Sequence, residues 1–182
     1  MRKLEPWRVL TSRTIFADAP HVNLTADDVE LPDGRVVEGY YQIGSRESCG
    51  VVATTADGAL VMLRQYKHGA RKICLTFPGG RREAGETMAE TARRELHEET
   101  GYEAQDWRSL GRFPIHANQH VGIVELFRAE GAVAVTEPAA GDLEDMEVTL
   151  VSEAEARQAL KNGDIALLGD AAALALALSE KR

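Results

Sequence analysis

One segment bounded by glycines limits the possible folds of this chain more than any other feature. Residues 87–100 contain neither Gly nor Pro, and Gly101 follows them. Glycine at that position commonly ends a helix in the left-handed conformation. Glu95, Glu98 and Glu99 stand at i, i+3 and i+4, so they share one helical face. The sequence therefore predicts a helix over 87–100 with an acidic face.

This acidic face overlaps the apolar face of the expected helix. At roughly 100° per residue, Glu99 falls between Met88 and Ala92 on the helical wheel. A solvated acidic stripe would lie opposite the buried side. A salt-bridged surface helix is the alternative explanation of a Glu-Glu pair, and the overlap argues against it. We expect at least Glu99 to lie at the edge of the core, where neighbouring carboxylates repel one another more strongly.

A divalent cation would relieve this repulsion. Carboxylate oxygens suit Mg²⁺ or Mn²⁺, and the sequence shows no Cys/His set of the kind that zinc prefers. Arg94 precedes Glu98 by one turn and is placed to hold that carboxylate in one rotamer. Gly79 and Gly80 allow a sharp turn before the helix. A backbone carbonyl in that turn could complete the oxygen shell of the cation.

Charge and composition argue against several other classes of function. The chain has 182 residues, the length of roughly one domain. Its 21 basic and 29 acidic residues give a net charge of -8, without a Lys/Arg run. Binding dominated by the phosphates of DNA or RNA, or by a membrane surface, is therefore not expected. The longest apolar stretch, residues 171–178, is far shorter than the roughly 20 residues of a membrane-spanning helix.

The cysteines and the first residues point to the cytoplasm. Cys49 and Cys74 cannot form a disulfide framework, and the N-terminal residues lead into no apolar signal-peptide region. We expect a soluble cytoplasmic protein whose thiols are reduced and buried.

The remaining patterns predict a β-rich lead-in over residues 1–45 and an α/β domain over 46–182. The lead-in contains a hairpin signal around Asp33-Gly34, because Asp-Gly supplies the positive φ that the turn needs. The elements expected beyond it are strands at 51–53, 59–63, 73–77, 107–113, 122–129 and 146–151, and helices at 87–100, 153–161 and 170–179. Helices interspersed with strands in this order indicate α/β layers around a mixed sheet.

The segment around the acidic helix resembles the Nudix box. Its fixed residues are Gly80, then Glu86 after five residues, Arg94-Glu95-Leu96 after seven more, Glu98-Glu99 after one, and Gly101 after one. Every fixed position matches, although Tyr102 stands where an aliphatic residue is more usual. So many fixed positions make a chance match very improbable. The resemblance implies a Nudix hydrolase, an α/β/α sandwich with a mixed sheet that cleaves a nucleoside diphosphate linked to another group.

The resemblance also implies roles for the box residues. Glu95 and Glu99 would be the main metal ligands, and Glu98 a ligand or a catalytic base. The carbonyl of Gly79 would be a further ligand. Arg94 would take part in catalysis by holding the Glu98 carboxylate in place.

Outside the box, the chain resembles the ADP-ribose and nucleoside-diphosphate-sugar pyrophosphatases. Residues 1–45 look like their N-terminal β domain, which typically swaps across a homodimer. Lys67 stands where many members have an Arg that contacts the substrate phosphates. Residues 142–148 resemble the acidic loop that supplies a catalytic base in this subgroup. Glu144 is the preferred base and Asp142 the alternative, and a solvated acidic turn is the structural explanation of the same residues.

Other substrate contacts stay open at this stage. Trp7 could stack on a nucleobase or pack at a dimer interface. Arg46 could reach a phosphate or lie on the surface. His116 and His120 have the spacing of helical metal ligands, but we expect a loop there, with substrate contact by His120. Pro114 lacks the Gly that often follows it in ADP-ribose enzymes, which leaves other sugar nucleotides open.

The sequence thus predicts a Mg²⁺- or Mn²⁺-dependent pyrophosphatase of nucleotide sugars that acts as a homodimer. An alternative within the same family is a hydrolase of NADH, coenzyme A, dinucleoside polyphosphates or oxidised nucleoside triphosphates. A non-catalytic nucleotide-binding module is the alternative of a different class. It is disfavoured because all three box carboxylates are present.

Overall fold

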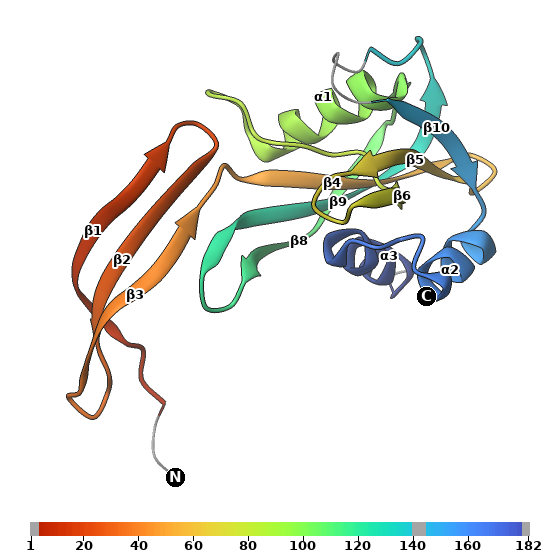
Figure 1. Cartoon of the computed structure of the whole chain (residues 1–182). Helices are drawn as coiled ribbons and strands as arrows, with labels where there is room; N and C mark the ends of the chain where they lie inside the picture. Colours follow the sequence, from red (N-terminus) through yellow and green to blue (C-terminus); the bar gives the residue numbers. More distant parts are fainter. Residues whose placement is uncertain (1–3, 140–144, 180–182) are drawn as a thin grey trace. The chain divides into compact units, whose positions relative to one another are not determined.

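The chain divides into two compact units that are interleaved in sequence. The computed structural model describes residues 4–139 and 145–179. The first unit comprises Met1–Glu47 and Pro114–Ile123, and the second comprises Ser48–Phe113 and Val124–Arg182. The first unit therefore combines the N-terminal segment with residues 114–123, which follow the box in sequence. Figure 1 labels the helices and strands along the chain.

The helices and strands follow one another in an order close to the expected one. The strands are β1 (Arg8–Asp18), β2 (Val22–Glu30), β3 (Val36–Gly44), β4 (Ser48–Thr55), β5 (Leu60–Lys67), β6 (Lys72–Thr76), β7 (Tyr102–Glu103), β8 (Asp106–His116), β9 (His120–Ala134) and β10 (Met146–Val151). The helices are α1 (Met88–Thr100), α2 (Glu153–Asn162) and α3 (Leu168–Ser179). The main differences from expectation are the short β7 and the greater length of β8 and β9, which no local pattern marked.

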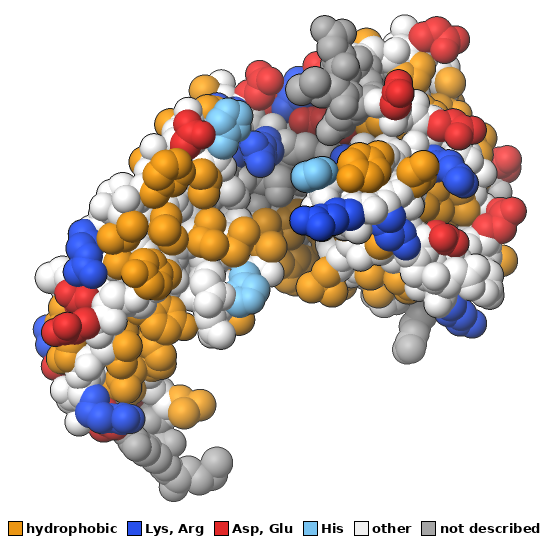
Figure 2. All heavy atoms as spheres, in the orientation of Figure 1, with side chains coloured by type: hydrophobic (Ala, Val, Ile, Leu, Met, Phe, Trp, Pro, Cys, Tyr) orange, Lys and Arg blue, Asp and Glu red, His pale blue; other side chains and the backbone are white. Residues whose placement is uncertain are grey.

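The first unit is built on an antiparallel sheet in which β2 lies between β1 and β3. Gly34 closes the β2–β3 hairpin with a φ of 85°, as the Asp-Gly pair predicts. The hairpin is also closed by the Leu31 N–H, which donates to the Arg35 carbonyl at 2.8 Å. Several large apolar side chains of this sheet are at least half exposed: Val9, Phe16, Val36 and Tyr41. Figure 2 shows hydrophobic side chains gathered over this unit.

The second unit contains the predicted mixed sheet. Strand β4 pairs in parallel with β9 and antiparallel with β5, and β5 pairs antiparallel with β10 on its other edge. Strand β6 also pairs antiparallel with β5, in a register that sets Leu63 opposite Thr76. The chain therefore leaves β6 close to the first half of β4. This position determines where the segment before α1 must run.

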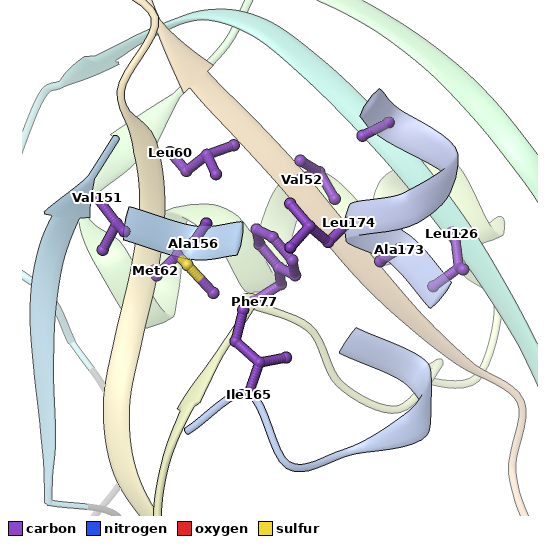
Figure 3. Close-up of a cluster of buried hydrophobic side chains, with 11 residues drawn as sticks. Val52, Leu60, Met62, Phe77, Leu126, Val151, Ala156, Ile165, Ala173 and Leu174 are labelled. Atoms are coloured by element: carbon purple, nitrogen blue, oxygen red, sulfur yellow. The ribbon is translucent and has the colours of Figure 1, made fainter. Parts of the chain in front are cut away.

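Helices cover both faces of this sheet, which confirms the expected α/β/α sandwich. On one face, Ala92 and Leu96 of α1 pack in a cluster that includes Val61. On the opposite face, a second cluster contains Met62 and Leu174, the latter from α3 (Figure 3). Successive β5 residues belong to opposite clusters because strand side chains alternate between faces. A strand buried on both faces is apolar without interruption, as residues 60–63 are.

The ends of α1 and α2 follow from local chemistry. Thr87 and Glu90 form a capping box at the start of α1, and Gly101 ends it with a φ of 72°. Ser152 and Glu155 form the same motif at the start of α2, which ends at Gly163. The predicted bounds of these helices are therefore confirmed to within a residue or two. Among the described residues, no helix has the length and apolar character needed to cross a membrane.

Candidate active site

The loop between β6 and α1 is held along β4 by backbone hydrogen bonds. The Val51 N–H donates to the Pro78 carbonyl at 2.8 Å, and the Cys49 N–H donates to the Gly80 carbonyl at 2.9 Å. The segment 78–80 therefore runs beside the first half of β4. This pairing fixes two glycines directly in front of the acidic face of α1.

Both glycines lie in close contact with neighbouring groups, and at Gly79 these groups are backbone atoms that cannot easily move. A Cβ on Gly79 would collide with the Cys49 carbonyl and lie 2.9 Å from the Gly50 Cα. A Cβ on Gly80 would collide with the carboxylate of Glu95. The Gly79 N–H donates to Glu99 Oε2 at 2.8 Å. The backbone at Gly79 is thus packed against β4 and bonded to Glu99, and the backbone at Gly80 lies directly against Glu95.

The three predicted carboxylates differ in burial. Glu99 is only 8% exposed, which confirms that it lies at the edge of the core. The side chain of Glu95 is 13% exposed, whereas that of Glu98 is 48% exposed. Burial raises the pKa of Glu95 above its usual value, although the neighbouring Arg94 guanidinium acts in the opposite direction. The surroundings of Glu95 therefore disfavour its charged form.

Arg94 holds these carboxylates together. Its Nη1 donates to Glu95 Oε1 at 2.9 Å and to Glu98 Oε2 at 3.0 Å, so the predicted contact with Glu98 is present. Its Nε donates to Glu86 Oε1 at 2.8 Å, and this bond is the main reason that the pKa of Glu86 falls to about 2. The second oxygen of Glu86 accepts from Thr91 Oγ1 at 2.8 Å. One guanidinium therefore orients carboxylates from the loop and from two turns of the helix.

The role of Glu86 as an anchor of Arg94 was missed by the sequence analysis. Glu86 is a fixed position of the box pattern, but eight residues separate it from Arg94 and no helical spacing joins them. The signal that could have found it is the glycine before it, since Gly85 has a φ of 89° and permits the chain to fold back.

The chemistry of the donor set fits a hard divalent cation. Glu95, Glu98, Glu99 and the Gly79 carbonyl offer only oxygen atoms, which Mg²⁺ and Mn²⁺ prefer. Among the hydrogen bonds of residues 4–139 and 145–179, none ends on the Gly79 carbonyl oxygen. Within those ranges no three Asp, Glu, His or Cys side chains already converge as metal ligands. The guanidinium of Arg94 is bound to one oxygen each of Glu95 and Glu98.

The predicted substrate contacts are distributed over both units. Lys67 ends β5 in the second unit, where it is partly buried. The first unit contains the other three residues, of which Trp7 lies edge-on to Tyr40 with ring centroids 5.6 Å apart. Arg46 is exposed between β3 and β4, and His120 is exposed with a left-handed φ of 64°. The two candidates for an external base, Asp142 and Glu144, lie outside the described residues.

The helical metal pair that the spacing of His116 and His120 allowed is not formed. These residues flank the turn between β8 and β9, as the expectation of a loop requires. His116 Nδ1 accepts from the backbone N–H groups of Asn118 at 3.3 Å and Gln119 at 3.2 Å. His116 therefore stabilises the turn.

Comparison with known families agrees with this geometry. Residues 44–168 match the NUDIX domain family, and residues 7–43 match the nucleoside diphosphate sugar hydrolase N-terminal domain. The chain belongs to the Nudix family. The box resemblance predicted from sequence is therefore confirmed, and with it the class of pyrophosphohydrolase. Nudix hydrolases generally use divalent metals, in agreement with the oxygen donor set.

Individual relatives match over most of this Nudix chain. It is 31% identical over 154 residues to an ADP-ribose pyrophosphatase of Bacillus subtilis, which covers 82% of each chain. It is 35% identical over 157 residues to a methanol dehydrogenase activator of Bacillus methanolicus, covering 83% of this chain and 80% of that one. A solved structure described as an ADP compounds hydrolase superposes with a TM-score of 0.83. That match covers 98% of this chain and 96% of the other at 23% identity, and it shows the shared fold.

The packing around Gly79 generates a stability prediction. We expect Gly79→Ala to lower the free energy of unfolding by about 1–3 kcal/mol, because the new Cβ must displace the backbone of β4. Gly69→Ala is the matched control, since a Cβ at that exposed turn meets nothing within 4 Å. Urea unfolding of the two variants measures the difference, and equal midpoints would contradict the close approach described above.

Proposed function

We propose that this Nudix protein hydrolyses the pyrophosphate bond of ADP-ribose or a related nucleoside diphosphate sugar. The products would be a nucleoside monophosphate and a sugar phosphate. The observation that carries the proposal is the combination of two parts in one chain. An N-terminal domain of the nucleoside diphosphate sugar hydrolase type precedes a Nudix domain in which the box carboxylates of Glu99 and Glu95 lie against Gly79 and Gly80. The relative named ADP-ribose pyrophosphatase supports the same substrate class.

The box residues would hold Mg²⁺ or Mn²⁺ through Glu95, Glu99 and the Gly79 carbonyl, with Glu98 as a further ligand or as a base. A bound divalent cation neutralises phosphate charge and lowers the pKa of a coordinated water. Arg94 donates to both Glu95 and Glu98 and so holds these two carboxylates beside each other. Glu98 is the most exposed of the three carboxylates, so it is the one best placed to accept a proton from an approaching water.

The substrate contacts are proposals on the same basis. Lys67 would contact a phosphate, although an ammonium lacks the bidentate fork of the Arg that is common at this position. Trp7 would stack on the nucleobase, and Arg46 and His120 would contact polar groups of the substrate.

A substrate panel distinguishes this proposal from the alternatives. Phosphate release through a coupled phosphatase would be measured with ADP-ribose, ADP-glucose, GDP-mannose, UDP-glucose, NADH, coenzyme A, a diadenosine polyphosphate and nucleoside triphosphates. Each would be tested with Mg²⁺, with Mn²⁺ and with EDTA. We expect metal-dependent turnover to be fastest with ADP-ribose or another nucleotide sugar.

The same assay tests the metal ligands. Glu99→Gln should lower turnover by at least roughly 100-fold, because the amide keeps the shape of the side chain and loses the charge. Glu83→Gln is the matched control, since the Glu83 side chain is exposed in the loop before the helix. Circular dichroism would show that both variants fold.

The outcomes separate the alternatives. Preference for a nucleotide sugar other than ADP-ribose keeps the chemistry and makes residues 114–120 the first segment to examine for specificity. Preference for NADH, coenzyme A, a dinucleoside polyphosphate or a triphosphate contradicts the substrate class. If no substrate of the panel is hydrolysed with either metal, the hydrolase proposal is contradicted and a nucleotide-binding module is favoured.

We further propose that Glu144 acts as the catalytic base outside the box. Glu144→Gln should then lower kcat by roughly 100-fold or more while KM changes little, because proton abstraction occurs after binding. Asp142→Asn, two residues away, provides the comparison. A wild-type kcat in Glu144→Gln would contradict this role. The base would then be Asp142 if Asp142→Asn is impaired, and Glu98 if it is not.

The N-terminal sheet is proposed to form a homodimer, because a three-stranded sheet with exposed apolar side chains needs a further surface to cover it. Light scattering should give twice the chain mass. The double variant Val9→Glu/Phe16→Glu should shift the protein to the monomer, whereas Ser12→Glu on the same strand should not. A monomeric wild type would refute the dimer.

A further inference from the structure

The C-terminal part of the chain binds the outer edge of β6, the strand that leads into the box. Lys72 Nζ donates to the Gly163 carbonyl at 2.6 Å. The Leu75 N–H donates to the Asp164 carbonyl at 2.9 Å, and the Phe77 N–H donates to Asp170 Oδ1 at 3.2 Å. Because β5 occupies the inner edge of β6, these bonds fix the strand from its other side.

Asp170 differs from the other two acceptors because it uses a side chain. Backbone carbonyls of Gly163 and Asp164 are available whatever the residue type, whereas the bond to Phe77 depends on a carboxylate at position 170. The ring of Phe77 lies in the core between the sheet and α3, among Met62 and Leu174 (Figure 3). Phe77 is therefore held at two points, by its ring and by its N–H.

The position of Asp170 is unfavourable for a carboxylate. Its Oδ2 is buried and has no hydrogen-bond partner among the residues that the structure describes. Burial raises the pKa of Asp170 to about 6, although the Phe77 N–H and the charge of Lys67 act in the opposite direction. An acidic residue in the first turn of α3 also interacts favourably with the helix dipole, but an exposed carboxylate would obtain that benefit without the cost of burial. The bond to Phe77 is thus a specific reason for placing the carboxylate here.

Phe77 lies two residues before the proposed ligand Gly79. Gly79 has no side chain of its own to anchor it, so its position depends on its neighbours. On one side, Pro78 and Gly80 are bound to β4, and on the other, the Gly79 N–H is bound to Glu99. A shift of Phe77 would move the Gly79 carbonyl and its contact with Glu99 together.

We infer that Asp170 is a positioning residue, which holds the chain at Phe77 so that the Gly79 carbonyl and the Glu99 carboxylate stay in register for a divalent cation. The inference rests on the proposed function only in treating these two groups as cation ligands. It assigns a role in the box site to α3, a helix on the opposite face of the sheet from α1.

Mn²⁺ binding to the metal-free protein tests this role without any nucleotide. Asp170→Ala should weaken Mn²⁺ affinity roughly 10-fold, as is usual when a group that orients a metal ligand is removed. Asp170→Asn should stay close to wild type, because the amide oxygen can still accept from Phe77. Asp164→Ala is the matched control, since it removes a carboxylate from the same connector and leaves the bonding carbonyl. Calorimetric titration would give the affinities.

A second variant covers the case in which Asp170→Ala does not fold. Asp170→Ser keeps a polar side chain in the first turn of α3, but its hydroxyl is too short to reach the Phe77 N–H. It should show the same loss of Mn²⁺ affinity, and amide hydrogen exchange should become faster at Phe77 and Gly79. Wild-type affinity in a folded Ser or Ala variant would overturn the inference.

Kinetics separate this inference from the proposed function. With the substrate that the wild type hydrolyses, the Ala or Ser variant should lower kcat and raise the Mg²⁺ concentration for half-maximal activity, with KM little changed. A purely structural role would lower the melting temperature and leave the metal requirement unchanged, which would overturn the inference. If the wild type binds Mn²⁺ but hydrolyses no nucleotide, the proposed function fails, and the Mn²⁺ titrations still decide the role of Asp170.

Discussion

The site depends on one guanidinium that is shared by several carboxylates. Arg94 donates to Glu86, Glu95 and Glu98 while its own side chain is only 22% exposed. Without that charge, acidic groups on adjacent turns would repel one another in surroundings that screen poorly. Arg suits this task because its planar fork offers donors in several fixed directions, which an ammonium cannot do. The acidic face of α1 can therefore form at the edge of the core.

The backbone that leads from β6 into the box is held by hydrogen bonds on both of its edges. Strand β4 binds residues 78–80 along one edge, and the connector before α3 binds β6 along another. Glycine at 79 and 80 permits the backbone to approach the carboxylates closely. The neighbouring strands keep the backbone in that position. The two glycines are conformationally free in an unfolded chain. In the fold they are fixed by hydrogen bonds to residues distant in sequence, Gly79 to Glu99 and Gly80 to Cys49.

Sequence reasoning succeeded where the information lies within a few residues. The bounds of α1 follow from Gly101, and the Arg94–Glu98 contact follows from helical spacing. The burial of Glu99 follows from the overlap of acidic and apolar positions. Sequence reasoning could not predict contacts between residues that only the sheet topology brings together. The bond between Gly79 and Glu99 spans 20 residues, and that between Phe77 and Asp170 spans 93. No periodicity joins such pairs, because the register of β6 on β5 determines them.

The electrostatic balance of the site also explains why its donor set suits a cation. The contacts of Arg94 place one positive charge among three carboxylates, while Glu99 accepts from a neutral backbone N–H. The pKa of Glu95 is raised even with Arg94 beside it, so the guanidinium does not fully offset the cost of burying that carboxylate. The pKa of Glu86 is lowered because it receives the strongest part of the same interaction. At Glu95 the cost of burying a carboxylate is therefore not fully offset by Arg94, and a divalent cation bound beside it would supply further positive charge.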